Sequence, residues 1–236
     1  MKITIISDTH NNHKLITDDL PGGDLLIHAG DISSMGYEHE ITEFCKWFDK
    51  IDNYDTKVFI AGNHDWGFQN NVKKTSKIVN SYKTIDYLQD ELLMVGEDYD
   101  KMIKIWGSPW QPEFYNWAFN LPRLGDELKK YWDMIPDDTD VLITHGPPNE
   151  ARDFVSNWRQ GDVNVGCELL RYRVDQIKPL VHVFGHIHGA YGPAYIKDTL
   201  FVNASICTEQ YIPSNKPIVI DLHEYDGEIV ATYVEI

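Results

Sequence analysis

The chain has 236 residues, of which 42% are hydrophobic and 25% charged, which is typical of a globular α/β protein with a substantial buried core. No apolar stretch approaches the roughly 20 residues of a transmembrane helix, and Met1-Lys2 lead directly into a strand-like run, so we expect neither a membrane span nor a secretory signal. The formal net charge of −16 argues against tight binding to long nucleic acids, which depends on neutralising many phosphates.

The three cysteines, Cys45, Cys167 and Cys207, are odd in number and lie far apart in the sequence. They fit neither a disulfide framework nor a zinc knuckle. We therefore expect free, buried thiols in a reducing compartment, and a cytoplasmic location.

Apolar runs alternate with helical patterns over most of the chain, and strand-like runs fill the tail. In chain order, strands are predicted at 3–6, 25–27, 58–60, 101–106, 141–143 and 181–184, and helices at 41–51, 71–82, 125–135 and 164–178. The tail adds strands at 200–203, 218–222 and 229–234. This order predicts one α/β domain over residues 1–236, with two packed sheets flanked by helices.

Five short polar clusters each follow one of the apolar runs. They are Asp8-Thr9-His10, Gly30-Asp31, Gly62-Asn63-His64-Asp65, His145, and Gly185-His186-Ile187-His188. Polar side chains at the ends of buried strands converge on one rim of a sheet, where α/β proteins place their sites. We therefore expect the clusters to meet at one functional site.

The residue types in these clusters are those that divalent metal ions bind. Such ions accept carboxylate oxygen, amide oxygen and imidazole nitrogen. Two ions about 3.5–4 Å apart need a shared ligand, and Asp31 is the predicted bridging carboxylate. The predicted ligands of the first ion are Asp8, His10 and His188, and those of the second are Asn63, His145 and His186.

Two pairs of predicted ligands are separated by one residue. They are Asp8 with His10 and His186 with His188. On an extended backbone, residues i and i+2 point the same way, so each pair is expected to face the metal cluster together. Gly185 and Gly189 would let the backbone turn there.

A pair of bridged ions would lower the pKa of a shared water, so that a metal-bridging hydroxide attacks phosphorus in line with the leaving oxygen. His64 is the expected catalytic residue, either protonating the leaving group or stabilising the transition state. Asn63 and His64 are also expected to contact the substrate. Asp65 is assigned a catalytic role as the hydrogen-bond partner that holds the His64 ring.

Each motif taken alone also has an ordinary structural explanation. Asp31 could cap a helix, the segment 63–65 could begin one, and His145 could be a loop residue. Arg152 and Arg159 could grip a phosphate or could equally be surface charges. The five clusters in this order, each after a strand-like run, favour the metal site over these explanations.

The remaining histidines are given smaller roles. His28 lies inside a strand, where it could support the site from behind or serve as a hydrogen-bonded core residue. His182 is predicted to be structural. His13, His39 and His223 are predicted to lie at the surface or in loops.

The ordered set of clusters resembles the calcineurin-like metallophosphoesterase superfamily. Segments 26–31, 106–110, 119–123, 144–148 and 182–188, continued by Asn203-Ala204-Ser205, are similar to its branch of metallophosphoesterase domain-containing proteins. The resemblance implies a four-layer α/β/β/α sandwich of two mixed sheets flanked by helices. It also implies phosphodiesterase activity with Mn²⁺ or similar ions. The chain has His186 where some relatives have glycine, which favours an active second metal site.

The leading hypothesis is a dinuclear phosphodiesterase that acts on small phosphodiesters or cyclic nucleotides. The alternatives are a phosphomonoesterase or nuclease of the same superfamily, or a nucleotide-binding protein with vestigial catalysis. The expected cofactors are two divalent ions, with Mn²⁺ preferred and Fe, Zn, Mg, Co or Ni as alternatives. The expected partners are a small phosphate ester and these metals, with no membrane and no long nucleic acid, and a homodimer is left open.

Overall fold

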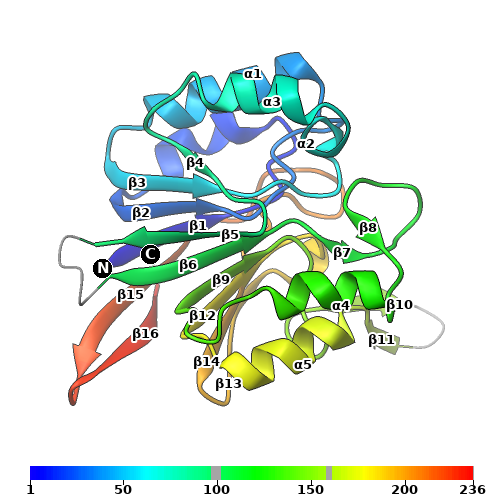
Figure 1. Cartoon of the computed structure of the whole chain (residues 1–236). Coiled ribbons are helices and arrows are strands. Elements are labelled where there is room, and N and C mark those ends of the chain that lie inside the picture. Colours follow the sequence, from blue (N-terminus) through cyan, green and yellow to red (C-terminus); the bar gives the residue numbers. More distant parts are fainter. Residues whose placement is uncertain (97–101, 158–160, 236) are drawn as a thin grey trace.

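Two six-stranded sheets pack face to face in the computed structural model, which describes residues 1–96, 102–157 and 161–235 (Figure 1). The first sheet, in the order β16-β15-β1-β2-β3-β4, consists of β1 (Lys2–Ile6), β2 (Gly23–His28), β3 (Tyr54–Phe59), β4 (Asp86–Tyr87), β15 (Ile218–Tyr225) and β16 (Glu228–Val234). The second, in the order β13-β14-β12-β9-β6-β5, consists of β5 (Glu91–Val95), β6 (Ile103–Ser108), β9 (Val141–Thr144), β12 (Val181–Phe184), β13 (Gly192–Ile196) and β14 (Thr199–Asn203). Two smaller ladders pair β7 (Gln111–Pro112) with β8 (Asn120–Leu121) and β10 (Phe154–Asn157) with β11 (Gly161–Asn164).

Helices cover the outer face of each large sheet (Figure 1). The first sheet is covered by the 3₁₀ helix η1 (His13–Asp19) and by α1 (Glu38–Lys50), α2 (Trp66–Asn70) and α3 (Val72–Val79). The second is covered by α4 (Asp126–Asp133) and α5 (Glu168–Ile177). A short 3₁₀ turn, η3 (His188–Ala190), follows β12. The predicted four-layer α/β/β/α sandwich of two mixed sheets is confirmed.

Alternating side chains of the central strands build the layers. In β1, Ile5 joins the core between the sheets, whereas Ile6 packs on the helix side of the first sheet. In β9, Ile143 joins the same central core and Leu142 packs on the side of α4 and α5. Both faces of these strands are therefore buried, which is why they appear in the sequence as continuous apolar runs.

Strand direction places the loops of interest on one side of the molecule. β1, β2 and β3 run parallel in the first sheet, and β6, β9, β12 and β14 run parallel in the second. The carboxyl ends of parallel strands lie at the same edge of a sheet, so the loops that follow β1, β2 and β3 are neighbours. The loops that follow β9 and β12 are neighbours in the same way.

Element boundaries differ from the predictions where a polar residue holds the chain. The predicted helix 164–178 begins only at Glu168, because residues 161–164 form β11 and the Asp153 carboxylate accepts a hydrogen bond from Gly166 N at 2.9 Å. The predicted helix 71–82 corresponds to α3, and the predicted strand 101–106 corresponds to β6, with Lys101 outside the described residues. The sequence pattern does not predict β4, β5, β7, β8, β10, β11 and β13.

Burial agrees with the sequence for the cysteines but not for one histidine. All three cysteines are free and buried, as predicted. His13, predicted at the surface or in a loop, begins η1 and is only 2% exposed, and its ring packs edge-on against Phe44. The error arose because an isolated polar residue carries no periodic pattern that would reveal burial. In the described ranges, no helix has the length and apolarity needed to cross a membrane.

We predict that Ile27→Ala lowers the free energy of unfolding by about 2–5 kcal/mol, the usual effect of emptying space in a packed core. Ile27 is fully buried between the two sheets. Leu15→Ala is the control, because Leu15 is 70% exposed and its truncation should change stability by no more than about 0.5 kcal/mol. Urea denaturation measures both variants, and equal unfolding midpoints would contradict the central position of Ile27.

Candidate metal centre

The loops after β1, β2, β3, β9 and β12 bring the predicted metal ligands to one rim of the paired sheets. These residues are Asp8, His10, Asp31, Asn63, His145, His186 and His188. The first five are buried, and the last two are half-buried. Segments from the two sheets therefore meet at this rim, as the positions of the clusters after strands predicted.

Asp8, His10 and His188 form a first group. Asp8 Oδ1 lies 3.3 Å from His188 Nε2, and His10 Nε2 lies 3.3 Å from the same nitrogen. One ligand atom from each of the three residues lies within 4.8 Å of the other two. This spacing suits three side chains that share one cation.

Asp31, Asn63, His145 and His186 form a second group. Asp31 Oδ2 lies 3.3 Å and Asn63 Oδ1 lies 3.0 Å from His145 Nε2. The His186 ring stands beside them, with its centroid 5.1 Å from that of His145. Asp31 Oδ2 is also 3.7 Å from His10 Nε2, so this carboxylate lies between the two groups. A bridging ligand would occupy that position.

Two imidazoles have a tautomer fixed by a backbone carbonyl. His145 Nδ1 lies 3.0 Å from Ala29 O, and His188 Nδ1 lies 2.9 Å from Thr208 O. A carbonyl oxygen only accepts, so Nδ1 carries the proton and Nε2 of the neutral ring turns a lone pair toward the cluster. Those lone pairs face oxygens that also carry lone pairs, and a cation between them removes the repulsion. The donor set therefore fits divalent metal ions.

The electrostatics of the cluster keep its carboxylates charged. Burial alone would raise the pKa of Asp8, but His188, His145 and His10 hold it well below its ordinary value. Burial lowers the pKa of His10 to about 4 and that of His186 to about 3, so both rings are neutral at pH 7. Burial also opposes protonation of His145, but Asp31 raises its pKa to about 9. A metal ion would displace that proton.

The backbone of the ligand loops is left-handed at several positions. The φ angle is 51° at Asp8, 41° at His10, 54° at Asp31 and 65° at His186. The expectation that the i and i+2 pairs converge on an extended backbone is therefore wrong, and tight turns aim these side chains instead. Such conformations cost on the order of 1–3 kcal/mol each and require support from their surroundings. Hydrogen bonds from Asp8 N to Gly30 O, and from His186 N to the Asp8 carboxylate, supply part of that support.

Ser205 and Asn203 support Asp8, a role that the sequence did not assign. Ser205 Oγ lies 2.9 Å from both Asp8 Oδ2 and Asn203 Oδ1. Asn203 Nδ2 donates to Ile187 O at 2.9 Å, which ties the same unit to the loop between His186 and His188. A signal was present in the sequence, because Asn203 ends the strand run 200–203 and Ser205 lies two residues after it, near the end of a strand like the five clusters.

Two buried histidines support threonines next to the ligands. His28 Nε2 lies 2.9 Å from Thr9 Oγ1, and His182 Nε2 lies 2.9 Å from Thr144 Oγ1. Thr144 Oγ1 also donates to Gly146 O at 2.8 Å, so His182 Nε2 must donate to the hydroxyl. Each histidine thus fixes a ligand loop from the helix side of its sheet.

His64 is held by a different partner from the one predicted. Its Nδ1 lies 2.8 Å from Ser34 O, and the Trp117 ring stacks on it with centroids 4.1 Å apart. The Asp65 carboxylate instead accepts hydrogen bonds from Gly62 N at 2.8 Å and Ser33 N at 3.0 Å. The role assigned to Asp65 is therefore corrected: it joins the loops after β2 and β3. A buried carboxylate is satisfied best by several donors, and backbone N–H groups of these two loops supply them here.

Of the two arginines considered for phosphate binding, Arg152 is engaged away from the predicted ligands. Arg152 Nε donates to Pro193 O at 3.1 Å, and its Nη1 donates to Tyr191 O at 3.5 Å, so its guanidinium fastens β13. Arg159 lies outside the described residues.

A cavity of about 450 Å³ opens above the second group of ligands. Its floor includes Asp31, Asn63, His64, His186 and His188. Its walls come from the segment around β7 and β8, from the segments around β10 and β11, and from the loop that contains Tyr211. A small ester could therefore reach the predicted ligands and His64 at the same time.

The sequence matches one known family, and the structure resembles solved structures. Residues 1–190 match the family model described as calcineurin-like phosphoesterase. The chain is 40% identical to metallophosphoesterase domain-containing protein 1 of Homo sapiens over 242 residues, covering 94% of this chain and 71% of that protein, and the Mus musculus protein gives the same values. The protein TT1561 of Thermus thermophilus aligns over 99% of both chains with a TM-score of 0.63 and 12% identity, a likeness of fold alone.

We predict that Gly185→Ala lowers the affinity for a metal ion by about 10–100-fold, the usual effect of disturbing the support of a ligand. A Cβ atom at Gly185 would collide with the Asp8 carboxylate and with Ser7 Oγ. Isothermal titration with Mn²⁺ measures the effect.

Gly146→Ala is the matched control for this substitution. Its Cβ would meet only Gln111, at an ordinary contact distance of 3.5 Å, so metal affinity should stay at the wild-type value. Equal affinities for wild type and Gly185→Ala would show that Asp8 does not need this close approach.

Proposed function

The chain belongs to the calcineurin-like phosphoesterase family, and from this premise we propose that it is a phosphodiesterase that hydrolyses small phosphodiesters, cyclic nucleotides included, at a centre of two divalent metal ions. The family implies metal-dependent hydrolysis of phosphate esters. The observation that carries the finer proposal is the position of Asp31 between two groups of ligand side chains.

We assign four side chains to each ion, with Asp31 shared. Asp8, His10, Asp31 and His188 would hold the first ion, and Asp31, Asn63, His145 and His186 would hold the second. The mixture of carboxylate, amide and imidazole donors suits Mn²⁺, Fe²⁺, Zn²⁺ or Co²⁺, and Mn²⁺ is our first choice. The orientation of His145 and His188, with Nε2 toward the cluster, supports this assignment.

Metal ions bound here would supply Lewis acidity toward phosphate oxygens and activate water as the nucleophile. Side chains of the protein would position the phosphate and supply the proton for the leaving oxygen. Asn63 and His64 lie on the cavity floor, within reach of a phosphate placed there. As the bond from phosphorus to the leaving oxygen breaks, that oxygen needs a proton, while the oxygen of water becomes bonded to phosphorus.

His64 is our choice as the proton donor. Its Nδ1–H is engaged by Ser34 O, so in the protonated ring Nε2–H is left to serve the leaving oxygen. Stacking with the Trp117 ring fixes the plane of the His64 ring. The Asp31 carboxylate oxygen accepts a hydrogen bond from His64 N at 2.8 Å, which ties the position of His64 to that of the proposed bridge.

We predict that the protein hydrolyses bis(p-nitrophenyl) phosphate when Mn²⁺ is added, because the proposed centre meets the needs of diester hydrolysis. Release of p-nitrophenolate measures the rate. The Asp31→Asn, His64→Ala double variant serves as the blank, and p-nitrophenyl phosphate reports on the monoesterase alternative. A wild-type rate no greater than that of the blank would reject the proposed function.

His64→Ala should retain the metal ions and lose about 10²–10⁴-fold in kcat, the scale of positioned acid–base assistance. Metal content by mass spectrometry and turnover of the same diester measure the two quantities. His39→Ala is the control, because His39 is exposed on α1. Loss of a metal ion from His64→Ala would show that His64 is a ligand, since it also stands near His10 and Asp31.

A further inference from the structure

The cavity wall above the ligands is largely apolar. Phe114 follows β7, Val155 belongs to β10, and Val165 follows β11. The Phe114 ring meets the His186 ring edge-on at a centroid distance of 6.2 Å, so the apolar wall begins beside the ligand floor. Phe114 is 54% and Val155 is 37% exposed, which leaves both available to a molecule in the cavity.

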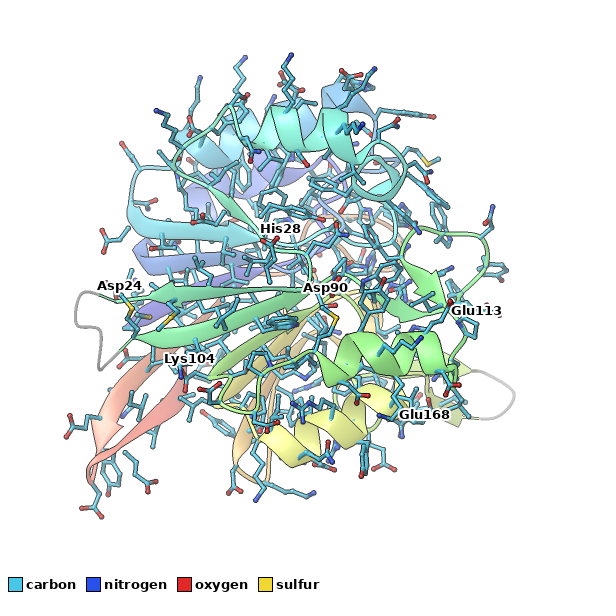
Figure 2. The ribbon with its side chains drawn as sticks, in the orientation of Figure 1. Asp24, His28, Asp90, Lys104, Glu113 and Glu168 are labelled. Atoms are coloured by element: carbon cyan, nitrogen blue, oxygen red, sulfur yellow. The ribbon has the colours of Figure 1, made fainter. Side chains whose placement is uncertain are left out.

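The charged side chains on this wall disfavour a substrate that carries a second negatively charged group besides the reacting phosphate. Outside the floor, the described residues that line the cavity include three charged ones, Glu113, Arg123 and Glu209. Glu113 lies beside β7 and β8 (Figure 2). A second phosphate or a carboxylate on the substrate would therefore meet like charges at the rim.

The guanidinium of Arg123 is already engaged. Its Nη1 donates to Gly166 O at 2.7 Å and to Glu168 at 3.0 Å, and its Nη2 donates to Val165 O at 2.7 Å. These bonds hold the chain between β11 and α5, where Val165 belongs to the wall. Arg123 thus stabilises this part of the wall, and these N–H donors are already used in hydrogen bonds within the protein.

We propose that the site selects phosphodiesters in which one ester group is apolar or aromatic and uncharged, and that this group packs against the wall formed by Phe114, Val155 and Val165. This inference rests on the proposed function, because it assumes that phosphate occupies the floor. Burial of the apolar group would stabilise the complex, and a second negative charge in its place would be repelled by Glu113 and Glu209.

A series of p-nitrophenyl phosphodiesters tests the wall at constant leaving group. The second ester group is methyl, butyl, phenyl or 3-carboxypropyl, and kcat/KM is measured on protein with quantified Mn²⁺. Each buried methylene is worth about fourfold at most, so butyl should exceed methyl by about tenfold or more. The 3-carboxypropyl ester should fall well below the butyl ester, which has a similar length. The kcat/KM of the phenyl ester relative to that of the butyl ester shows whether aromatic stacking adds to the effect of apolar burial.

Variants assign the selectivity to the wall. Phe114→Ala should lower the butyl-to-methyl ratio several-fold, because Val155 and Val165 remain in the wall, and Phe114→Leu should restore most of it. Leu124→Ala is the matched control, because Leu124 is 70% exposed and does not line the cavity, so the ratio should be that of wild type. Glu113→Gln combined with Glu209→Gln should raise the rate of the 3-carboxypropyl ester relative to the butyl ester.

The outcomes separate this inference from the function on which it rests. Equal kcat/KM for methyl and butyl esters, or for butyl and 3-carboxypropyl esters, would overturn the selectivity while the phosphodiesterase proposal stands. A wild-type ratio retained in Phe114→Ala would also overturn it. If no member of the series is hydrolysed by fully metal-loaded protein, the proposed function fails and the inference fails with it.

Discussion

A buried carboxylate surrounded by imidazole nitrogens is the constraint on which the rest of the structure depends. Asp31 Oδ2 lies 3.3 Å from His145 Nε2 and 3.7 Å from His10 Nε2, at the rim where the two sheets meet. Asp31 raises the pKa of His145 to about 9, so without a cation this ring carries a proton that offsets part of the carboxylate charge. The fold thus brings a carboxylate and several imidazole nitrogens close together, and a positive charge between them would stabilise the cluster.

The sandwich supplies what such a cluster requires of its backbone. Asp8, His10, Asp31 and His186 all adopt positive φ, and isolated loops would not keep four such residues in that conformation. Here each loop begins at the end of a buried parallel strand, and its neighbours hold it through bonds across the rim. Ser205, for example, contacts Asp8 from 197 residues away in sequence. Ligand geometry is therefore a property of the two packed sheets together.

The sequence predicted that these side chains gather at one rim, because the relevant signals are local. A continuous apolar run marks a strand buried on both faces, and a polar residue after it marks the rim, so Asp31 and His145 could be placed from their immediate neighbours. The predictions that were wrong concern contacts between segments that lie far apart in the sequence. The partner of His64 is the carbonyl of Ser34, and Asp65 binds the loop that contains Ser33. The start of α5 depends on Asp153, and no periodic pattern records such a bond.

In the function that we propose, the cavity floor performs the chemistry and the cavity walls select the substrate. The floor belongs to strand ends inside the core, where a change in backbone would disturb both sheets. The walls come from the loop that contains Tyr211 and from segments in and around two small ladders, β7 with β8 and β10 with β11, which lie outside the two large sheets. Peripheral segments tolerate substitution more readily than core strands, so the wall can change while the ligand set is preserved. If the proposed selectivity holds, substitutions at Phe114 and Val155 would change which ester is accepted and leave the residues of the floor in place.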